Sequence, residues 1–130
     1  ISSGTVDACV DEGMGCIAFS ALAQGMLTSN YLKGIPEGSR ATKSQFLKPD
    51  AISKGLVVQL TRLNGLAQQR GQTLAQMAIS WVLNNKGVTS ALVGASKPEQ
   101  ITDCVGALEN QNFSPDELAQ ILDILSHQQQ

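Results

Sequence analysis

The apolar residues of this chain recur at helical spacing in five separate segments. The first segment covers 4–12 and is followed by Gly13, which can adopt the left-handed conformation that ends many helices. The second covers 52–70 and is followed in the same way by Gly71. These two segments predict one short and one long amphipathic helix. Their apolar stripes are Val6, Cys9 and Val10 in the first helix, and Ile52, Leu56, Leu60, Leu63 and Ala67 in the second.

The other three predicted helices each begin at a sequence typical of a helix N-terminus. Thr73, Ser96 and Ser114 are expected to be N-cap residues, each paired in a capping box with the residue three positions later. Phe113 and Leu118 are placed to form a hydrophobic staple around the last of these N-termini. The capping partners are Gln76, Glu99 and Glu117, and the expected stripes are Leu74, Met77, Ala78, Trp81 and Val82, then Ile101, Cys104, Val105 and Leu108, then Ile121, Leu122 and Leu125.

Two short apolar runs, 16–19 and 89–93, are predicted to be strands. Neither run alternates with polar residues, so each strand is expected to be buried on both faces. Residues 20–49 lack any sustained period and are interrupted by glycine and proline. Because loops of this length inside compact domains are uncommon and usually functional, we expect 20–49 to be a functional loop. The polar tail 127–130 is expected to fray.

The order of these elements predicts an α/β fold. Strands that alternate with helices form parallel sheets with right-handed crossovers. Two parallel strands do not form a stable sheet alone, so further strands are expected from outside this chain, which also begins without Met. A (β/α)8 TIM barrel takes about 250 residues. We therefore expect residues 1–130 to be the C-terminal part of such a barrel, in a single domain whose last helix covers 114–126.

Composition and charge exclude several classes of function. With 42% hydrophobic and 15% charged residues, the chain does not have the composition of a disordered protein. A net charge of −2 gives no basic surface, so neither nucleic acid nor a membrane is an expected partner. No apolar run approaches the length of a membrane span, and we expect a cytoplasmic protein. Cys9, Cys16 and Cys104 lack the spacing of a disulfide framework or a metal site, and are expected to be reduced, buried thiols.

Four sequence motifs occur in order along the chain. Residues 15–28 read GCIAFSALAQGMLT, and residues 34–41 read GIPEGSRA. Residues 76–83 read QMAISWVL, and residues 92–101 read LVGASKPEQI. The first, third and fourth motifs resemble the seventh strand and its loop, the next helix and the eighth strand of the aldo-keto reductase family. The second motif resembles a segment of the branch that holds bacterial glyceraldehyde-3-phosphate reductases and potassium-channel beta subunits.

The resemblance implies that the loops after the two strands hold NADP(H), in an enzyme that reduces aldehyde or ketone carbonyls by hydride transfer. The first loop would line the pyrophosphate and the nicotinamide ribose, and the second the adenosine and its 2′-phosphate. Three departures affect this transfer, since Ala21, Asn30 and Cys104 replace a proline, a lysine and an asparagine that are frequent in the family. The implied cofactor-binding residues are Ser20, Leu22, Gln24, Gly25, Leu27 and Arg40 in the first group, and Gly94, Ser96, Lys97, Gln100, Asp103 and Cys104 in the second.

The predicted helix start at Ser96 is also a candidate anion site on physical grounds. The first turn of a helix has unpaired N–H groups and a partial positive charge, and Lys97 adds a full charge. Glu99 is expected to turn back to the Ser96 backbone, which leaves no acidic residue to repel a phosphate and favours NADP over NAD. A purely structural N-cap at Ser96 is the alternative.

The catalytic residues of the family lie on earlier strands of its barrel, so no catalytic residue is expected in this chain. Its single tyrosine, Tyr31, falls in the long loop, where a packing role is expected, and its single histidine, His127, falls in the polar tail. Catalysis is therefore assigned to a missing N-terminal portion. The expected partners are a small carbonyl substrate and the remainder of the barrel, or another copy of the chain in a homo-oligomer. A nucleotide-binding regulatory subunit, like the potassium-channel beta proteins, and an independent helical interaction module remain alternatives.

Overall fold

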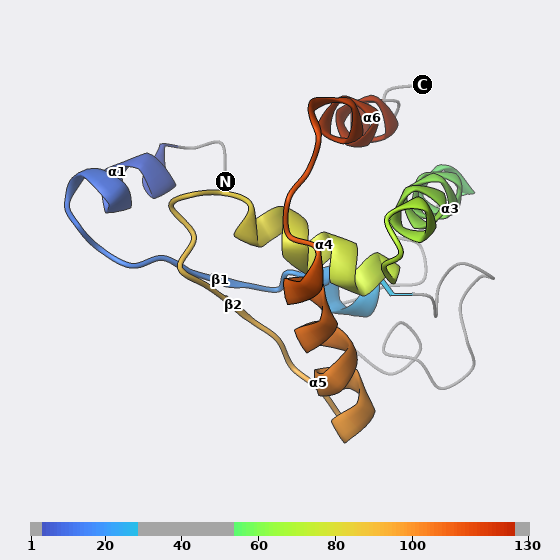
Figure 1. The fold of residues 1–130 in the computed structure, drawn as a ribbon, viewed down its shortest axis with the longest axis horizontal. Coiled ribbons are helices and arrows are strands. Elements are labelled where there is room, and N and C mark those ends of the chain that lie inside the picture. Colours follow the sequence, from blue (N-terminus) through green and yellow to red (C-terminus); the bar gives the residue numbers. More distant parts are fainter. Residues whose placement is uncertain (1–3, 29–53, 127–130) are drawn as a thin grey trace.

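The computed structural model describes residues 4–28 and 54–126 (Figure 1). All five predicted helices and both predicted strands are present there, and none of these helices is long and apolar enough to cross a membrane. Arg40, Tyr31, His127 and the side chain of Gln24 lie outside the described residues. In chain order the elements are α1 (Thr5–Asp11), β1 (Ile17–Phe19), the 3₁₀ helix η1 (Ala23–Gly25), α3 (Lys54–Gln69), α4 (Leu74–Leu83), β2 (Ser90–Leu92), α5 (Pro98–Val105), the 3₁₀ helix η4 (Gly106–Glu109) and α6 (Pro115–Ser126).

The two strands pair in parallel, as the order of elements predicts, with Phe19 opposite Leu92. Near the amino end of the pair, the Thr89 N–H donates to the Cys16 carbonyl (2.8 Å), and the Thr89 hydroxyl accepts from the Cys16 N–H (3.1 Å). Gly15 leaves room for this contact, because a Cβ at that position would lie 3.2 Å from the Thr89 hydroxyl oxygen. These bonds fix the register of the sheet.

The prediction that the strands are buried on both faces is wrong for this chain. Ile17, Phe19 and Leu92 share one face of the sheet, and they are 67%, 78% and 64% exposed. Ala18 and Ala91, on the opposite face, are half-buried. The physical reason is that no element within 4–28 and 54–126 covers the face that carries Phe19.

The hydrophobic core lies between α3, α4 and α6 instead of around the sheet. α4 is at the centre and contacts α3, α5, η4 and β2, while α6 packs on α3 (Figure 1). Met26 and Leu27, which follow η1, pack against the core from outside, together with Leu56 and Phe113. The core comprises Leu60, Leu63, Leu66 and Ala67 of α3, Leu74 and Met77 of α4, and Ile121 and Ile124 of α6.

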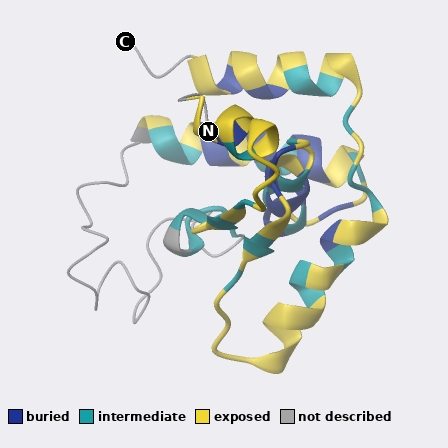
Figure 2. Cartoon of the chain, turned by 90° about the vertical axis from the view of Figure 1, so that its left-hand side faces the viewer, coloured by how far each residue is buried: buried dark blue, intermediate teal, exposed yellow. Residues whose placement is uncertain are grey.

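The buried faces differ from the predicted stripes in all five predicted helices. α4 is surrounded by other elements and is therefore buried on most sides, whereas α6 is buried only along the line where it meets the core. α5 has no buried residue, and Figure 2 shows most of it as exposed. The helical residues buried beyond the predictions are Gln59, Leu66, Ala75, Ile79, Ser80, Ala107 and Ile124, and the predicted stripe residues that are exposed are Val10, Trp81, Ile101, Val105, Leu108, Leu122 and Leu125.

Two of the three predicted capping boxes are confirmed. The Gln76 N–H donates to the Thr73 hydroxyl (3.1 Å), and the Thr73 N–H donates to the Gln76 side-chain oxygen (2.9 Å). The Ser114 N–H donates to the Glu117 carboxylate (2.7 Å), and the Glu117 N–H donates to the Ser114 hydroxyl (3.2 Å). The glycines predicted to end helices have left-handed conformations, with φ of 66° at Gly13 and 69° at Gly71.

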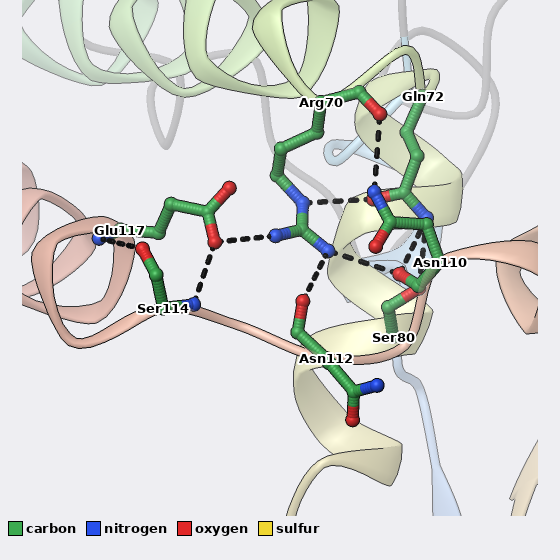
Figure 3. Close-up of polar contacts among 7 residues, drawn as sticks. All are labelled: Arg70, Gln72, Ser80, Asn110, Asn112, Ser114 and Glu117. Atoms are coloured by element: carbon green, nitrogen blue, oxygen red, sulfur yellow. Dashed lines mark hydrogen bonds and ion pairs between the residues drawn. The ribbon is translucent and has the colours of Figure 1, made fainter.

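A polar network after the C-terminus of α3 joins distant parts of the chain (Figure 3). The Arg70 side chain, only 2% exposed, forms an ion pair with Glu117 (2.8 Å), and its guanidinium stacks on the Phe113 ring (3.8 Å to the centroid). The same guanidinium donates to the carbonyls of Asn110 (2.9 Å) and Asn112 (3.1 Å). These contacts tie the connection between η4 and α6 to the end of α3.

Substitution Glu117→Gln is expected to lower the free energy of unfolding at neutral pH and to lose this effect in acid. The Ser114 N–H, and after it the Arg70 guanidinium, hold the pKa of the Glu117 carboxyl below its ordinary value. A carboxyl whose pKa is lowered on folding contributes stability above its ordinary pKa, and this contribution is lost as the pH falls through the folded-state pKa. Urea unfolding of the chain and the variant, followed by circular dichroism from pH 7 to about pH 3, checks this. A loss of unfolding free energy in Glu117→Gln that is equal at all pH values would contradict this prediction.

Candidate cofactor site

The carboxyl ends of β1 and β2 lie at the same edge of the sheet, because the strands are parallel and Phe19 pairs with Leu92. The loop 20–28 leaves β1 at this edge, and the segment 93–97 leaves β2 there and leads into α5 (Figure 1). In parallel α/β folds, ligands bind at this edge. The structure thus brings the described residues of the first group, together with Gly94, Ser96 and Lys97 of the second, to one edge of the sheet.

The loop after β1 is held in a compact series of turns. Ser20 and Ala23 have φ of 58° and 45°, values that are uncommon for residues other than glycine and that cluster at functional sites. The Ala23 N–H donates to the Ser20 carbonyl (2.8 Å), and the Leu27 N–H donates to the Leu22 carbonyl (3.2 Å). The Thr28 hydroxyl donates to the Gly25 carbonyl (2.7 Å). The loop is therefore defined by its own hydrogen bonds before any ligand binds.

Within this loop the predicted cofactor residues have different surroundings. Gly25 has φ of 95°, and a Cβ there would meet nothing within 4 Å, so its backbone has room for a ligand. Leu22 is half-buried, and Ser20 is exposed directly after the strand. Leu27 packs against the hydrophobic core, so a part of its surface is used by the fold.

The predicted N-cap at Ser96 is wrong, because α5 begins one residue later. Lys97 is the N-cap, which places Pro98 at the first helical position, the position that proline favours. The Gln100 side-chain oxygen accepts from the N–H groups of Ser96 (2.8 Å) and Lys97 (3.1 Å). Gln100 therefore makes the bond to the Ser96 N–H that was expected of Glu99, and it also occupies the Lys97 N–H, which was expected to be free for an anion.

The remaining groups on this side are open to solvent. Gly94, Ser96, Lys97 and Gln100 are all exposed, and a Cβ at Gly94 would meet nothing within 4 Å. An exposed ammonium beside open backbone suits a phosphate-bearing ligand. On this geometry, the residues of the two loops fit a dinucleotide cofactor.

Asp103 and Cys104 lie further along α5 and face different surroundings. The Asp103 carboxylate accepts hydrogen bonds from the Gln76 side-chain amide (3.0 Å) and from the Thr73 hydroxyl (3.3 Å), so α4 already engages it. Cys104 is half-buried. Burial, and then the negative charge of Asp103, raise the pKa of the Cys104 thiol, which therefore stays protonated at neutral pH.

The contacts of Gln76 and Thr73 with Asp103 were not predicted from the sequence. In the sequence, Thr73 and Gln76 are recognised only as a capping pair, from their spacing of three residues. Their contact with Asp103 joins positions about thirty apart in the chain, and no local pattern indicates it. Within 4–28 and 54–126, no group of three or more His, Cys, Asp or Glu side chains could hold a metal ion, and the three cysteines are free thiols.

Comparison with known proteins gives the family of the chain. Residues 1–126 match the family model described as "Aldo/keto reductase family". The chain belongs to this family. A solved structure, the glycerol dehydrogenase from Gluconobacter oxydans, superposes on the chain with a TM-score of 0.68 at 26% identity, over 94% of this chain and 37% of that one. The predicted fold class, a part of a (β/α)8 barrel with parallel strands and flanking helices, is confirmed.

Curated relatives match most of this chain at higher sequence identity than the solved structure does. The L-glyceraldehyde 3-phosphate reductase of Escherichia coli O157:H7 is 51% identical over 123 residues, which are 92% of this chain and 36% of that protein. A putative voltage-gated potassium channel subunit beta of Schizosaccharomyces pombe is 37% identical over 121 residues, which are 88% of this chain and 35% of that protein. The chain thus spans about a third of the length of these relatives.

Proposed function

We propose that this chain is the NADP(H)-binding part of an oxidoreductase that reduces aldehyde or ketone carbonyls by hydride transfer. The observation that carries the proposal is the parallel register of β1 and β2, which places the loop 20–28 and the segment 93–97 at one edge of the sheet. Family membership and the reductase and dehydrogenase names of the relatives support the oxidoreductase class.

Each loop has its own task in this proposal. The loop after β1 holds the pyrophosphate and the nicotinamide ribose, because Gly25 lets the backbone approach and Ser20 supplies a hydroxyl. Arg40, which lies outside the described residues, is assigned to the adenine or phosphate side by the family resemblance alone. The start of α5 holds the adenosine and the 2′-phosphate, with Lys97 as the cation. When bound, the cofactor supplies the hydride, while this chain binds and orients it. The full set is Ser20, Leu22, Gln24, Gly25, Leu27, Arg40, Gly94, Ser96, Lys97, Gln100, Asp103 and Cys104.

We further propose that the acid–base residues and the carbonyl substrate site belong to segments outside these 130 residues. The exposed sheet face of Ile17, Phe19 and Leu92 supports this, since apolar side chains on a parallel sheet are normally covered. The remainder of a barrel, or another copy of the chain in a homo-oligomer, would cover this face in a cytoplasmic enzyme. The isolated chain is therefore expected to self-associate or to bind apolar dyes through this face. A chain that stays monomeric at all concentrations and binds no apolar dye contradicts this part of the proposal.

A graft tests the cofactor function. We define the grafted reductase as the Escherichia coli L-glyceraldehyde 3-phosphate reductase whose matching 123 residues are replaced by those of this chain, an exchange that the 51% identity makes practicable. The grafted reductase is expected to bind NADPH and to oxidise it with an aldehyde. The chain alone is expected to show no turnover. A folded graft that binds no dinucleotide, or turnover by the pure chain, overturns the proposal.

One alternative has an observation in its favour. A potassium channel subunit beta is among the relatives, at 37% identity. In a regulatory subunit of this kind the nucleotide would be bound as a ligand with little turnover. Binding of NADPH by the grafted reductase with no carbonyl reduction, when the unmodified enzyme is active, would favour this alternative.

A further inference from the structure

α5 carries several proposed cofactor residues but contributes no fully buried side chain to the core. None of its residues is buried, and Ile101 and Val105 are 53% and 58% exposed. Its packing partners are α4 and η4. The orientation of α5 must therefore come largely from polar contacts with α4, which are directional and fix a helix in one position.

Gln76 makes the central polar contact between the two helices. Its side-chain amide donates to both the backbone carbonyl (3.0 Å) and the carboxylate (3.0 Å) of Asp103. Its side-chain oxygen accepts from the Thr73 N–H (2.9 Å), so both ends of the amide are fixed. The Thr73 hydroxyl adds a bond to the same carboxylate (3.3 Å). One glutamine thus joins the N-terminus of α4 to the last turn of α5.

The Gln76 amide packs directly against Gly106. A Cβ at Gly106 would lie 2.5 Å from the Gln76 side-chain nitrogen, closer than side chains tolerate. The backbone of Gly106 is right-handed helical, a conformation that alanine adopts without strain. Glycine at position 106 is therefore explained by the space that the Gln76 amide occupies, and not by the backbone conformation.

Asp103 lies one turn after Gln100 on α5, and Gln100 in turn accepts from the N–H groups of Ser96 and Lys97. Fixing Asp103 therefore fixes the helix start that carries Lys97. We propose that Gln76 is a positioning residue for the dinucleotide site, and that it holds Asp103 and the first turn of α5 in the orientation that receives the adenosine end of the cofactor. This inference rests on the proposed function.

The grafted reductase provides the test. Gln76→Met removes both hydrogen-bonding ends of the amide but keeps the length of the side chain. It is expected to raise the NADPH dissociation constant about fivefold while kcat at saturating NADPH stays within about twofold. Asp103→Asn is expected to weaken binding as well, and the double variant is expected to lose no more than the larger single loss, because the two residues act in one contact. Gln68→Met, the same change at an exposed position of α3, is the matched control and should bind NADPH normally.

Gly106→Ala is the second variant, because it displaces the Gln76 amide without removing a polar group. It is expected to weaken NADPH binding in the same direction as Gln76→Met, even if Gln76→Met lowers the melting temperature. Amide hydrogen exchange without cofactor provides a readout that is independent of binding, and the amides of α5 are expected to exchange faster in both variants. If the unmodified graft binds no dinucleotide, the proposed function fails, and hydrogen exchange still tests the orientation of α5. Unchanged exchange in α5, or unchanged NADPH affinity in both variants of a binding-competent graft, overturns the positioning role.

Discussion

Substitution Arg70→Met is expected to lower the free energy of unfolding by about 3–5 kcal/mol, the range measured when one partner of a buried ion pair is removed. The Arg70 side chain is 2% exposed, and the variant leaves Glu117 without its cation. It also leaves the Asn112 carbonyl without its arginine donor, leaves the Asn110 carbonyl with only the Gln72 side-chain amide as donor (3.0 Å), and removes the stacking on Phe113. Methionine fills a similar volume, so most of the loss should come from the polar groups.

The surface pair Arg62–Asp123 provides the matched control for this prediction. Its distance is also short, 3.0 Å, but its side chains are 46% and 53% exposed. Arg62→Met is therefore expected to change stability by no more than about 1 kcal/mol. Urea unfolding of the chain and both variants, followed by the circular dichroism of the helices, compares the two. Similar losses for Arg62→Met and Arg70→Met would mean that burial of the Arg70 pair is not what stabilises the fold.

The sequence predicted best those features that depend on a few neighbouring residues. The capping boxes at Thr73 and Ser114 each involve residues three apart, and both form as predicted. The box predicted at Ser96 does not form; one position later, the Gln100 side chain accepts from the Lys97 N–H, but lysine has no acceptor with which to complete a box. Lys97 and Gln100 have the same spacing as Ser96 and Glu99, and only the later start puts Pro98 at its favoured position. Spacing alone could not decide between these two starts.

Features that depend on distant residues were predicted less well. Ile124 is buried whereas Leu122 and Leu125 are exposed, because the side of α6 that meets the core carries Ile121 and Ile124. Ile124 and Leu125 flank Ile121 on opposite sides, three and four positions along the helix, so only the neighbouring element decides which of them is buried. The Arg70 contacts span about forty to fifty positions in the chain, and nothing near Arg70 in sequence predicts them. The parallel pairing of the two strands was predicted correctly, because it follows from the order of helices and strands alone, and it puts the loops after both strands at one edge of the sheet.

The structure also changes which group should select the cofactor. The sequence assigned the 2′-phosphate to the Ser96 hydroxyl, free N–H groups and Lys97 together, with Glu99 withdrawn into the cap. In the structure, Gln100 occupies the N–H groups of Ser96 and Lys97, and the Ser96 hydroxyl also donates to the Gln100 side-chain oxygen (3.2 Å). Lys97 is exposed, and it is the cation at this helix start. The preference for a phosphate should therefore depend mainly on the Lys97 charge.

Substitution Lys97→Ala in the grafted reductase is accordingly expected to weaken NADPH binding by at least about tenfold and NADH binding by less than about twofold. A charge-assisted hydrogen bond to phosphate is worth roughly 1.5–3 kcal/mol, of which about 1.4 kcal/mol is already tenfold, and NADH lacks this phosphate. Ser96→Ala is expected to have a smaller effect, because its hydroxyl is already engaged by Gln100. Calorimetric titration with both cofactors measures the two losses, and Lys86→Ala, at an exposed lysine beyond the C-terminus of α4, serves as the control for a change in net charge. Added salt should reduce the NADPH advantage of the unmodified graft more than that of Lys97→Ala, because salt screens an exposed charge. Equal losses of NADPH and NADH affinity in Lys97→Ala would show that the start of α5 is a structural helix end and that the 2′-phosphate is bound elsewhere.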